Sequence, residues 1–313
     1  MTNLSEFTFL SSDGKTQLHG MLWEPEGVAV RAVLQICHGV AEHIARYDGF
    51  ARALNEQGIV VAGHDHLGHG KSLPEGGTPV YFGEGNTWNT VVDDIYILHQ
   101  RLKQRYPDAP LCIMGHSMGS FLTRTYLIRY PGTVKAAVIM GTGWQPRAAI
   151  TGGLALANAI AAVSGENATS ELVTELAFGS YNKLFAPNRT KVDWLSADES
   201  NVDDYIADPL CGADATVGLF RQMLHGIRFN QRQSHLRQMD REMPVLFVAG
   251  DKDPVGSCGK GVRQTYDAFR AAGMRDCTLK LYPGLRHEIL NEKAYTADIT
   301  KDIEAWLLSR LKK

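Results

Sequence analysis

A serine framed by two glycines is at the centre of the chemistry that this sequence can perform. Gly115, Ser117 and Gly119 form a GxSxG pattern that directly follows the apolar run 111–114 and opens onto a helix-like stretch. In a nucleophile elbow, a strand turns into a helix so tightly that the serine is strained, and side chains two residues to either side would collide with neighbouring backbone. The pattern therefore predicts a nucleophilic Ser117 on a surface-exposed turn. It also predicts that the Met118 N–H starts a helix and points at a developing anion.

A nucleophilic serine needs a base, and the base needs an acid that orients it. His287 follows the alternating segment 277–282, and two carboxylates, Asp251 and Asp253, follow the buried apolar segment 243–250. We expect Asp253 to orient His287, because it lies farther beyond its strand and can reach back to an imidazole. Asp251 is then expected to satisfy backbone N–H groups of the turn. An imidazole with a pKa of ~6.5 accepts a hydroxyl proton near neutrality, so the serine, Asp253 and His287 form a predicted triad.

Several other histidines are expected to have structural rather than catalytic roles. His116 lies beside the nucleophile, but adjacent side chains on an elbow point in different directions, so we expect a buried hydrogen-bonding partner rather than a base. His38 and His43 are expected to organise the loop that follows residues 31–37. His225 and His235 lie in a helical, charged stretch and are expected at the surface.

A second cluster of histidines suggests a metal site as an alternative. His64, His66 and His69 have HxHxxH spacing, which resembles part of the HxHxDH zinc signature of metallo-β-lactamase-like hydrolases, and imidazoles are common metal ligands. The aspartate of that signature falls on Gly68, however, and the further ligands of a two-metal site are not evident. We therefore favour a packed DxxGxGxS turn that starts at Asp65, and we expect no metal.

The elements that must position these residues alternate along the chain. Apolar periodicity and turn residues predict strands near 7–10, 17–23, 32–37, 59–64, 110–114, 135–140, 244–249 and 277–282. Helical periodicity predicts helices at 47–57, 88–106, 121–130, 261–272 and 294–311. This alternation favours an α/β fold with a mostly parallel, eight-stranded sheet and helices on both faces. Ligands should then bind at the carboxyl ends of the strands, where the three triad residues also fall.

Six segments together resemble the monoacylglycerol lipase and lysophospholipase-like branch of the α/β-hydrolase superfamily. They are HGVAEH at 38–43 with the arginine and tyrosine at 46–47, DHLGHGKS at 65–72, GHSMG at 115–119, DPLCG at 208–212, GDKDP at 250–254 and YPGLRHE at 282–288. The resemblance covers nearly the whole chain. It implies an α/β-hydrolase fold and a serine hydrolase without a cofactor.

The resemblance also implies an oxyanion hole made of backbone. The N–H of Val40 would face that of Met118, and Gly39 permits the close approach. Removal of one such donor typically costs about 2.7–4 kcal/mol of transition-state stabilisation. The family more commonly has alanine at the position of Val40 and glycine at that of Ala41. Because the contact is made through backbone, we expect these changes to alter the pocket wall rather than the chemistry.

The alternation of strands and helices stops between residues 141 and about 232, where the superfamily inserts a lid. Helical segments are predicted there at 152–163, 171–178 and 217–229. We therefore expect a hydrolase core of residues 1–143 and 215–313 and a helical cap of residues 144–214, inserted after the sixth strand, with 208–212 supporting its return. The apolar, small-residue segment 152–163 either lines an acyl tunnel and touches lipid surfaces, or is an ordinary packed helix.

Composition excludes some classes of function. The 313 residues carry a net charge of −2, so no basic patch favours nucleic acid. The first residues lack the basic and apolar regions of an export signal, and no uninterrupted apolar run approaches the ~20 residues of a membrane span. The cysteines are odd in number and widely spread, which argues against a disulfide framework and favours a reducing cytoplasm. They are Cys37, Cys112, Cys211, Cys258 and Cys277.

The sequence therefore predicts a serine hydrolase that cleaves lipid-like carboxylic esters, either monoacylglycerol or lysophospholipid, through an acyl-enzyme. It is expected in the cytoplasm, with transient contact of the cap with a membrane surface. The same triad also suits a broad carboxylesterase or a serine peptidase, because fold does not choose substrate. A non-catalytic binding protein of the same fold is the remaining alternative.

Overall fold

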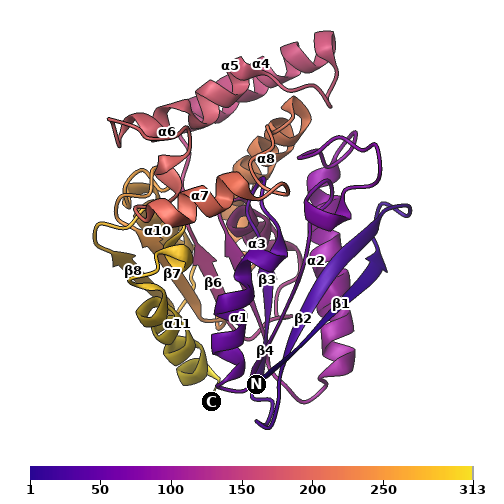
Figure 1. Cartoon of the computed structure of the whole chain (residues 1–313), viewed down its shortest axis with the longest axis vertical. Coiled ribbons are helices and arrows are strands. Elements are labelled where there is room, and N and C mark those ends of the chain that lie inside the picture. The colour runs from indigo at the N-terminus through magenta and orange to yellow at the C-terminus, as the bar shows by residue number, and fades with distance from the viewer. Residues whose placement is uncertain (312–313) are drawn as a thin grey trace.

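An eight-stranded sheet forms the centre of the molecule (Figure 1). The computed structural model describes residues 1–311. The strands are β1 (Thr2–Leu10), β2 (Gln17–Pro25), β3 (Ala32–Cys37), β4 (Ile59–His64), β5 (Leu111–His116), β6 (Ala137–Met140), β7 (Val245–Gly250) and β8 (Cys277–Tyr282). Their order is β1-β2-β4-β3-β5-β6-β7-β8. The pairs β1–β2 and β2–β4 are antiparallel and all the others are parallel, which confirms the expected mostly parallel sheet.

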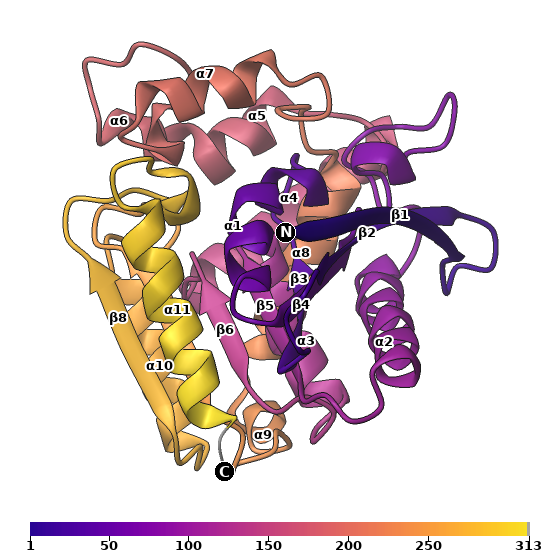
Figure 2. The ribbon, with the colours of Figure 1, turned by 60° about the horizontal axis from the view of Figure 1, so that its bottom comes forward.

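Helices cover both faces of this sheet, as expected. One face packs against α1 (Asp48–Asn55) and α11 (Thr296–Arg310), and the other packs against α2 (Thr87–Arg105), α3 (Met118–Arg129), α8 (Val217–Asn230) and α10 (Lys260–Ala271). Figure 2 shows α11 in front of the sheet and α10 behind it. Successive residues of a strand point to opposite faces. In β5, for example, Ile113 joins the core beneath α2 and α3, whereas Cys112 and Met114 join the core beneath α1 and α11.

The segment after β6 is helical and lies beyond the edge of the sheet (Figure 1). It contains α4 (Arg147–Ser164), α5 (Glu171–Thr174), a π-helical turn (Glu175–Gly179), α6 (Ser180–Lys183) and α7 (Glu199–Ala207), and α8 returns the chain to the core. Short helical turns elsewhere are α9 (Gln233–Leu236) and the 3-10 turns Ile44–Tyr47, Gly70–Ser72, Asp193–Leu195 and Ile289–Asn291.

Helix α4 differs from its sequence prediction in where it begins. It starts at Arg147 rather than at residue 152, because Pro146 precedes its first turn and accepts a hydrogen bond from the Ile150 N–H at 3.1 Å. Gly153, one of its two glycines, has a packing role. A Cβ on Gly153 would lie 2.9 Å from the Leu224 side chain of α8, so glycine permits the close approach of the two helices. The predicted helix 171–178 is instead divided between α5 and the π turn, and α6 follows directly at Ser180.

Among the residues described, α4 is also the one helix that is long and apolar enough to cross a membrane by length and composition. Thr151 and Asn158 interrupt its apolar residues, so the helix qualifies by its mean hydropathy over 18 residues rather than by an unbroken apolar run. Only 17% of the helix is buried. Its outer surface is therefore exposed, while its inner surface faces α8.

Candidate active site

Ser117 occupies a nucleophile elbow between β5 and α3. Its backbone has φ 53° and ψ −122°, a left-handed region that residues with a Cβ rarely adopt. A Cβ on Gly119 would lie 2.0 Å from the Cys37 carbonyl oxygen, and one on Gly115 would lie 2.3 Å from the Gly119 carbonyl oxygen. The glycines are therefore required by backbone crowding, as the sequence predicted.

The exposure of this turn was predicted wrongly. Only 9% of Ser117 is accessible, because the residue faces a cavity rather than the outer surface of the molecule. The helices inserted after β6 form much of the wall of that cavity. A motif in the chain carries no information on which remote segment folds back over it.

The structure brings the predicted base and acid together. Nδ1 of His287 lies 3.0 Å from Oδ1 of Asp253, and both side chains are buried. The carboxylate of Asp251 instead accepts a hydrogen bond from the Gly284 N–H at 2.8 Å, which is the turn role expected for it. Only Asp253 is therefore placed to orient the imidazole. The catalytic roles of Asp253 and His287 stay predictions.

The imidazole of His287 lies next to the elbow. Its ring centroid is 4.7 Å from that of His116, the residue before the serine, and 5.1 Å from the ring of Trp194. His116 is buried, as expected, and its ring nitrogens face the Glu42 carboxylate at 3.2 Å and the His287 carbonyl oxygen at 3.3 Å. Although burial opposes protonation of His116, the hydrogen bond and the charge of Glu42 raise its pKa.

The predicted oxyanion loop faces the same cavity. Val40, Ser117 and Met118 all line it, and a Cβ on Gly39 would lie 3.1 Å from the Cβ of Ser117. His38 fixes the loop from behind: its Nε2 accepts the His66 N–H at 2.9 Å, so its Nδ1 is left to donate to the Gly39 carbonyl at 2.8 Å. A trans peptide is planar, so this bond also sets the direction of the Val40 N–H.

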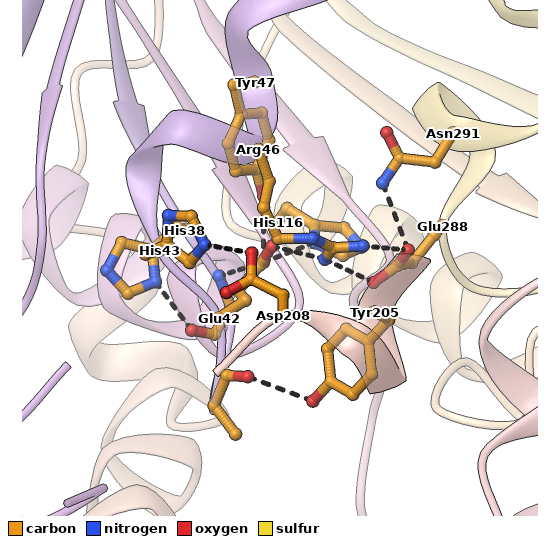
Figure 3. A network of polar contacts seen from close by, with 12 residues as sticks. His38, Glu42, His43, Arg46, Tyr47, His116, Tyr205, Asp208, Glu288 and Asn291 are labelled. Atoms are coloured by element: carbon orange, nitrogen blue, oxygen red, sulfur yellow. Dashed lines mark hydrogen bonds and ion pairs between the residues drawn. The ribbon is translucent and has the colours of Figure 1, made fainter. Parts of the chain in front are cut away.

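Glu42 holds the loop from the other side and was missed by sequence reasoning. Its buried carboxylate accepts hydrogen bonds from the Gly39 N–H at 2.5 Å, the Tyr47 hydroxyl at 3.0 Å and Arg46 at 2.9 Å (Figure 3). Burial disfavours its charge, but the hydrogen bond from His116 and the charge of Arg46 hold the pKa of Glu42 well below its usual range. The sequence did contain a clue to this role, because Glu42 lies within the motif at 38–47, between His38-Gly39 and Arg46-Tyr47.

Arg46 links this loop to the loop that carries the base. Its guanidinium makes bidentate contacts of 2.7 and 2.8 Å with Glu288, 242 residues away and adjacent to His287 (Figure 3). Asn201, from α7, also donates to Glu288 at 2.8 Å. A carboxylate and a guanidinium in this paired geometry form strong, directional hydrogen bonds. The loop of residues 38–43 and the loop that carries His287 are therefore held as one unit.

The histidines of the HxHxxH spacing pack against one another. The ring of His66 lies 4.2 Å from that of His38 and 5.1 Å from that of His64. Burial lowers the pKa of His64 to about 3 and that of His69 to about 3. The packed turn predicted to start at Asp65 is present. The Asp65 carboxylate accepts a hydrogen bond from the Lys71 N–H at 2.9 Å.

Another group of side chains, within residues 1–311, is close enough to hold a metal ion. It consists of His43, Asp208 and Cys211, whose possible ligand atoms lie within 4.8 Å of one another. His43 was expected to organise the oxyanion loop, and its Nε2 contacts the Asp208 carboxylate at 2.8 Å.

The expected surface positions of His225 and His235 are only half correct, because both side chains are partly buried. The Nδ1 atom of His235, for example, lies 2.9 Å from the Phe229 carbonyl oxygen.

A cavity of about 520 Å³ extends from the elbow between α4 and α8. Beyond Ser117 its wall is mainly apolar, and α4 and α8 both contribute side chains to it. The wall includes Ile150, Leu156, Phe178, Phe220, Leu224 and Ile227. Helix α4 thus lines the cavity and packs on α8 at the same time. Whether segment 152–163 binds an acyl chain or touches lipid surfaces stays a prediction.

Comparison with known proteins shows that this chain is similar to hydrolases. The model of the family described as serine aminopeptidase, S33, matches residues 28–294. A monoacylglycerol lipase of Mycolicibacterium smegmatis is 31% identical over 98% of both chains. A monoglyceride lipase of Mus musculus is 28% identical over 96% of this chain and 90% of its own. The crystal structure of a thermostable carboxyl esterase from Bacillus coagulans in complex with glycerol has a TM-score of 0.92 and 26% identity, and the match covers 99% of this chain and 100% of that one. The expected α/β-hydrolase fold is confirmed.

Proposed function

We propose that this chain, which belongs to the serine aminopeptidase S33 family of α/β hydrolases, is an ester hydrolase that acts on lipid-like carboxylic esters through Ser117, His287 and Asp253. The observation that carries the proposal is the apolar cavity that opens onto Ser117. Apolar pockets with a few convergent polar groups are typical substrate sites. The names of the relatives, monoacylglycerol lipase and monoglyceride lipase, point to the same class of substrate.

The proposed reaction is acyl transfer in two steps. His287, held in its productive tautomer by Asp253, accepts the proton of the Ser117 hydroxyl as the oxygen attacks the ester carbonyl. The N–H groups of Val40 and Met118 stabilise the oxyanion of the tetrahedral intermediate. His287 then protonates the leaving alcohol, which departs and leaves an acyl-enzyme. Water repeats the cycle on the acyl-enzyme and releases the fatty acid.

The cavity favours a monoacylglycerol over a lysophospholipid. Its wall contains no charged side chain among the residues described. A phosphate head group would therefore be buried there without a cation to pair with, which is costly. A glycerol head group is uncharged, and an acyl chain gains free energy from burial against Leu156, Phe178 and Leu224.

We further propose that residues 144–214 form a cap over a core of residues 1–143 and 215–313, and that this cap makes transient contact with a membrane surface. Large apolar side chains on it are exposed, with 88% of Val163, 54% of Leu172 and 64% of Leu176 accessible. Apolar side chains of this kind insert readily at a lipid interface. A cytoplasmic location is supported by the cysteines, all of which are free thiols.

A substrate panel tests the proposal. Monoacylglycerols, lysophosphatidylcholines and p-nitrophenyl esters of several chain lengths should be compared for kcat/KM, together with labelling of Ser117 by a fluorophosphonate probe. We expect labelling and a preference for monoacylglycerols. Failure of the native protein to react with the probe would instead support the non-catalytic alternative.

Two observations support alternatives within the hydrolases. The esterase with a TM-score of 0.92 supports a carboxylesterase as an alternative, and a carboxylesterase of broad specificity would show similar kcat/KM for short and long esters. The family description favours an aminopeptidase, which would need a carboxylate to bind a free amino group. The described wall of the cavity contains no carboxylate, so we expect aminoacyl substrates to be cleaved poorly.

A further inference from the structure

The oxyanion loop contains a residue in a disfavoured conformation. Ala41 follows Val40 and has φ 53°, in the left-handed region where a Cβ crowds the backbone. This conformation turns the chain back on itself, so that the Glu42 carboxylate reaches the Gly39 N–H at 2.5 Å. If Ala41 relaxed to an ordinary φ, Glu42 would move away from Gly39. The peptide that carries the Val40 N–H would then lose one of its supports.

The interactions that hold Ala41 come from the far side of the helical insertion. Its carbonyl oxygen accepts the Tyr205 hydroxyl at 3.0 Å and the Gly212 N–H at 3.0 Å. Tyr205 belongs to α7 and is 164 residues away in the chain. Among the hydrogen bonds of residues 1–311, no donor from the loop itself reaches the Ala41 carbonyl oxygen.

The ring of Tyr205 is fixed independently of its hydroxyl. Tyr205 is buried, and the guanidinium of Arg46 lies over its ring at 5.0 Å from the centroid (Figure 3). Arg46 is itself held by its bidentate contacts with Glu288. Burial raises the pKa of Tyr205 above its ordinary value, so the hydroxyl stays a hydrogen-bond donor at working pH. Removal of the hydroxyl alone should therefore leave the ring in place.

We propose that Tyr205 is a positioning residue for catalysis. Its hydroxyl keeps Ala41 left-handed, and thereby keeps the Val40 N–H directed at the oxyanion. The proposal rests on the proposed function, because it assigns Val40 a role in ester hydrolysis. It means that the inserted helical segment contributes to the chemical step as well as to the cavity wall.

Glycine at position 41 provides the decisive test. Glycine adopts a left-handed φ about as readily as a right-handed one, so Ala41→Gly should make the Tyr205 hydroxyl unnecessary. The variants Tyr205→Phe, Ala41→Gly and the double variant should be compared in the full chain, with p-nitrophenyl butyrate and a monoacylglycerol as substrates. Asp203→Asn is the matched control, because it removes an ion pair of the same helix with Arg189 on the surface.

We expect Tyr205→Phe to lower kcat about tenfold, which corresponds to about 1.4 kcal/mol, with KM within about twofold of the wild type. The double variant should return to within about threefold of Ala41→Gly, and Asp203→Asn should match the wild type. Wild-type kcat in Tyr205→Phe would overturn the proposal. So would a double variant as slow as Tyr205→Phe, because a general effect on packing, or a direct contact of Tyr205 with substrate, is not relieved by glycine at 41.

A fluorophosphonate probe separates this inference from the function on which it rests. If the wild type is not labelled and hydrolyses no ester, the proposed function fails. If the wild type is labelled and active while the glycine variant gives no rescue, only the role of Tyr205 fails. Melting temperatures of all variants show whether each of them folds.

Discussion

The buried imidazole of His64 leads to a quantitative prediction about stability and pH. His64 is fully buried, and neither ring nitrogen has a hydrogen-bond partner among the residues described. Burial, aided by repulsion from His38, lowers its pKa from 6.5 to about 3. The unfolded chain binds a proton at this site below pH 6.5, whereas the folded protein does so only below about pH 3. Stability is therefore lost as the pH falls from 6.5 towards 3.

The size of this loss follows from the two pKa values. Between pH 7 and pH 5, the difference in proton binding at His64 lowers the free energy of unfolding by about 2 kcal/mol. Other groups also titrate in this range, so the wild-type curve alone does not isolate the effect. Replacement of His64 by leucine, which has a similar volume and no charge, removes this one contribution.

Urea unfolding at pH 7 and pH 5 provides the measurement. The decrease in the free energy of unfolding between the two values should be about 2 kcal/mol smaller in His64→Leu than in the wild type. Phe9→Leu is the control, because Phe9 contacts the His64 ring edge-on at 5.2 Å and its truncation should cost the same at both pH values. An identical decrease in the wild type and in His64→Leu would refute the reasoning.

Three further predictions concern the proposed active site. Ser117→Ala should lower kcat at least about 10³-fold in an esterase assay, with an unchanged melting temperature; appreciable residual turnover would remove the serine from the mechanism. Asp253→Asn should lower kcat by roughly 10⁴-fold, whereas Asp251→Asn, which only weakens a turn, should stay within about threefold of the wild type. Equal losses would mean that the acid is misassigned. Leu156→Gln, which polarises the cavity wall, should lower kcat/KM for long-chain esters by about tenfold while short-chain esters change little. An equal loss at all chain lengths would contradict an acyl-binding role.

The local features of the site were predictable because they depend on short-range sterics. Gly115 and Gly119 are demanded by an elbow whatever surrounds it. The positions of Asp253 and His287 followed from a general property of parallel sheets, whose strands deliver their carboxyl ends to one edge. In this part of the site, residue spacing and a buried strand were sufficient for the prediction.

The remaining features depend on contacts between remote parts of the chain. Arg46 and Glu288 are 242 residues apart, and no periodicity indicates that one faces the other. The burial of Ser117 depends on where the inserted helices fold back, which the elbow motif does not encode. The first turn of α4 was missed because it lies ahead of the apolar run and is started by Pro146.

The contacts of the returning part of the insertion have a consequence for protein engineering. Arg286 donates to the Asp193 and Ser196 carbonyls at 2.5 and 2.9 Å, and Tyr205 and Gly212 donate to Ala41. A graft that exchanges α4 through α6 for those of a relative would alter chain-length selectivity and leave these bonds intact. A graft that extends through residues 193–212 would also replace the residues that hold Arg286 and Ala41. A change in the activity of such a chimera would then reflect the loss of these hydrogen bonds as well as the new cavity.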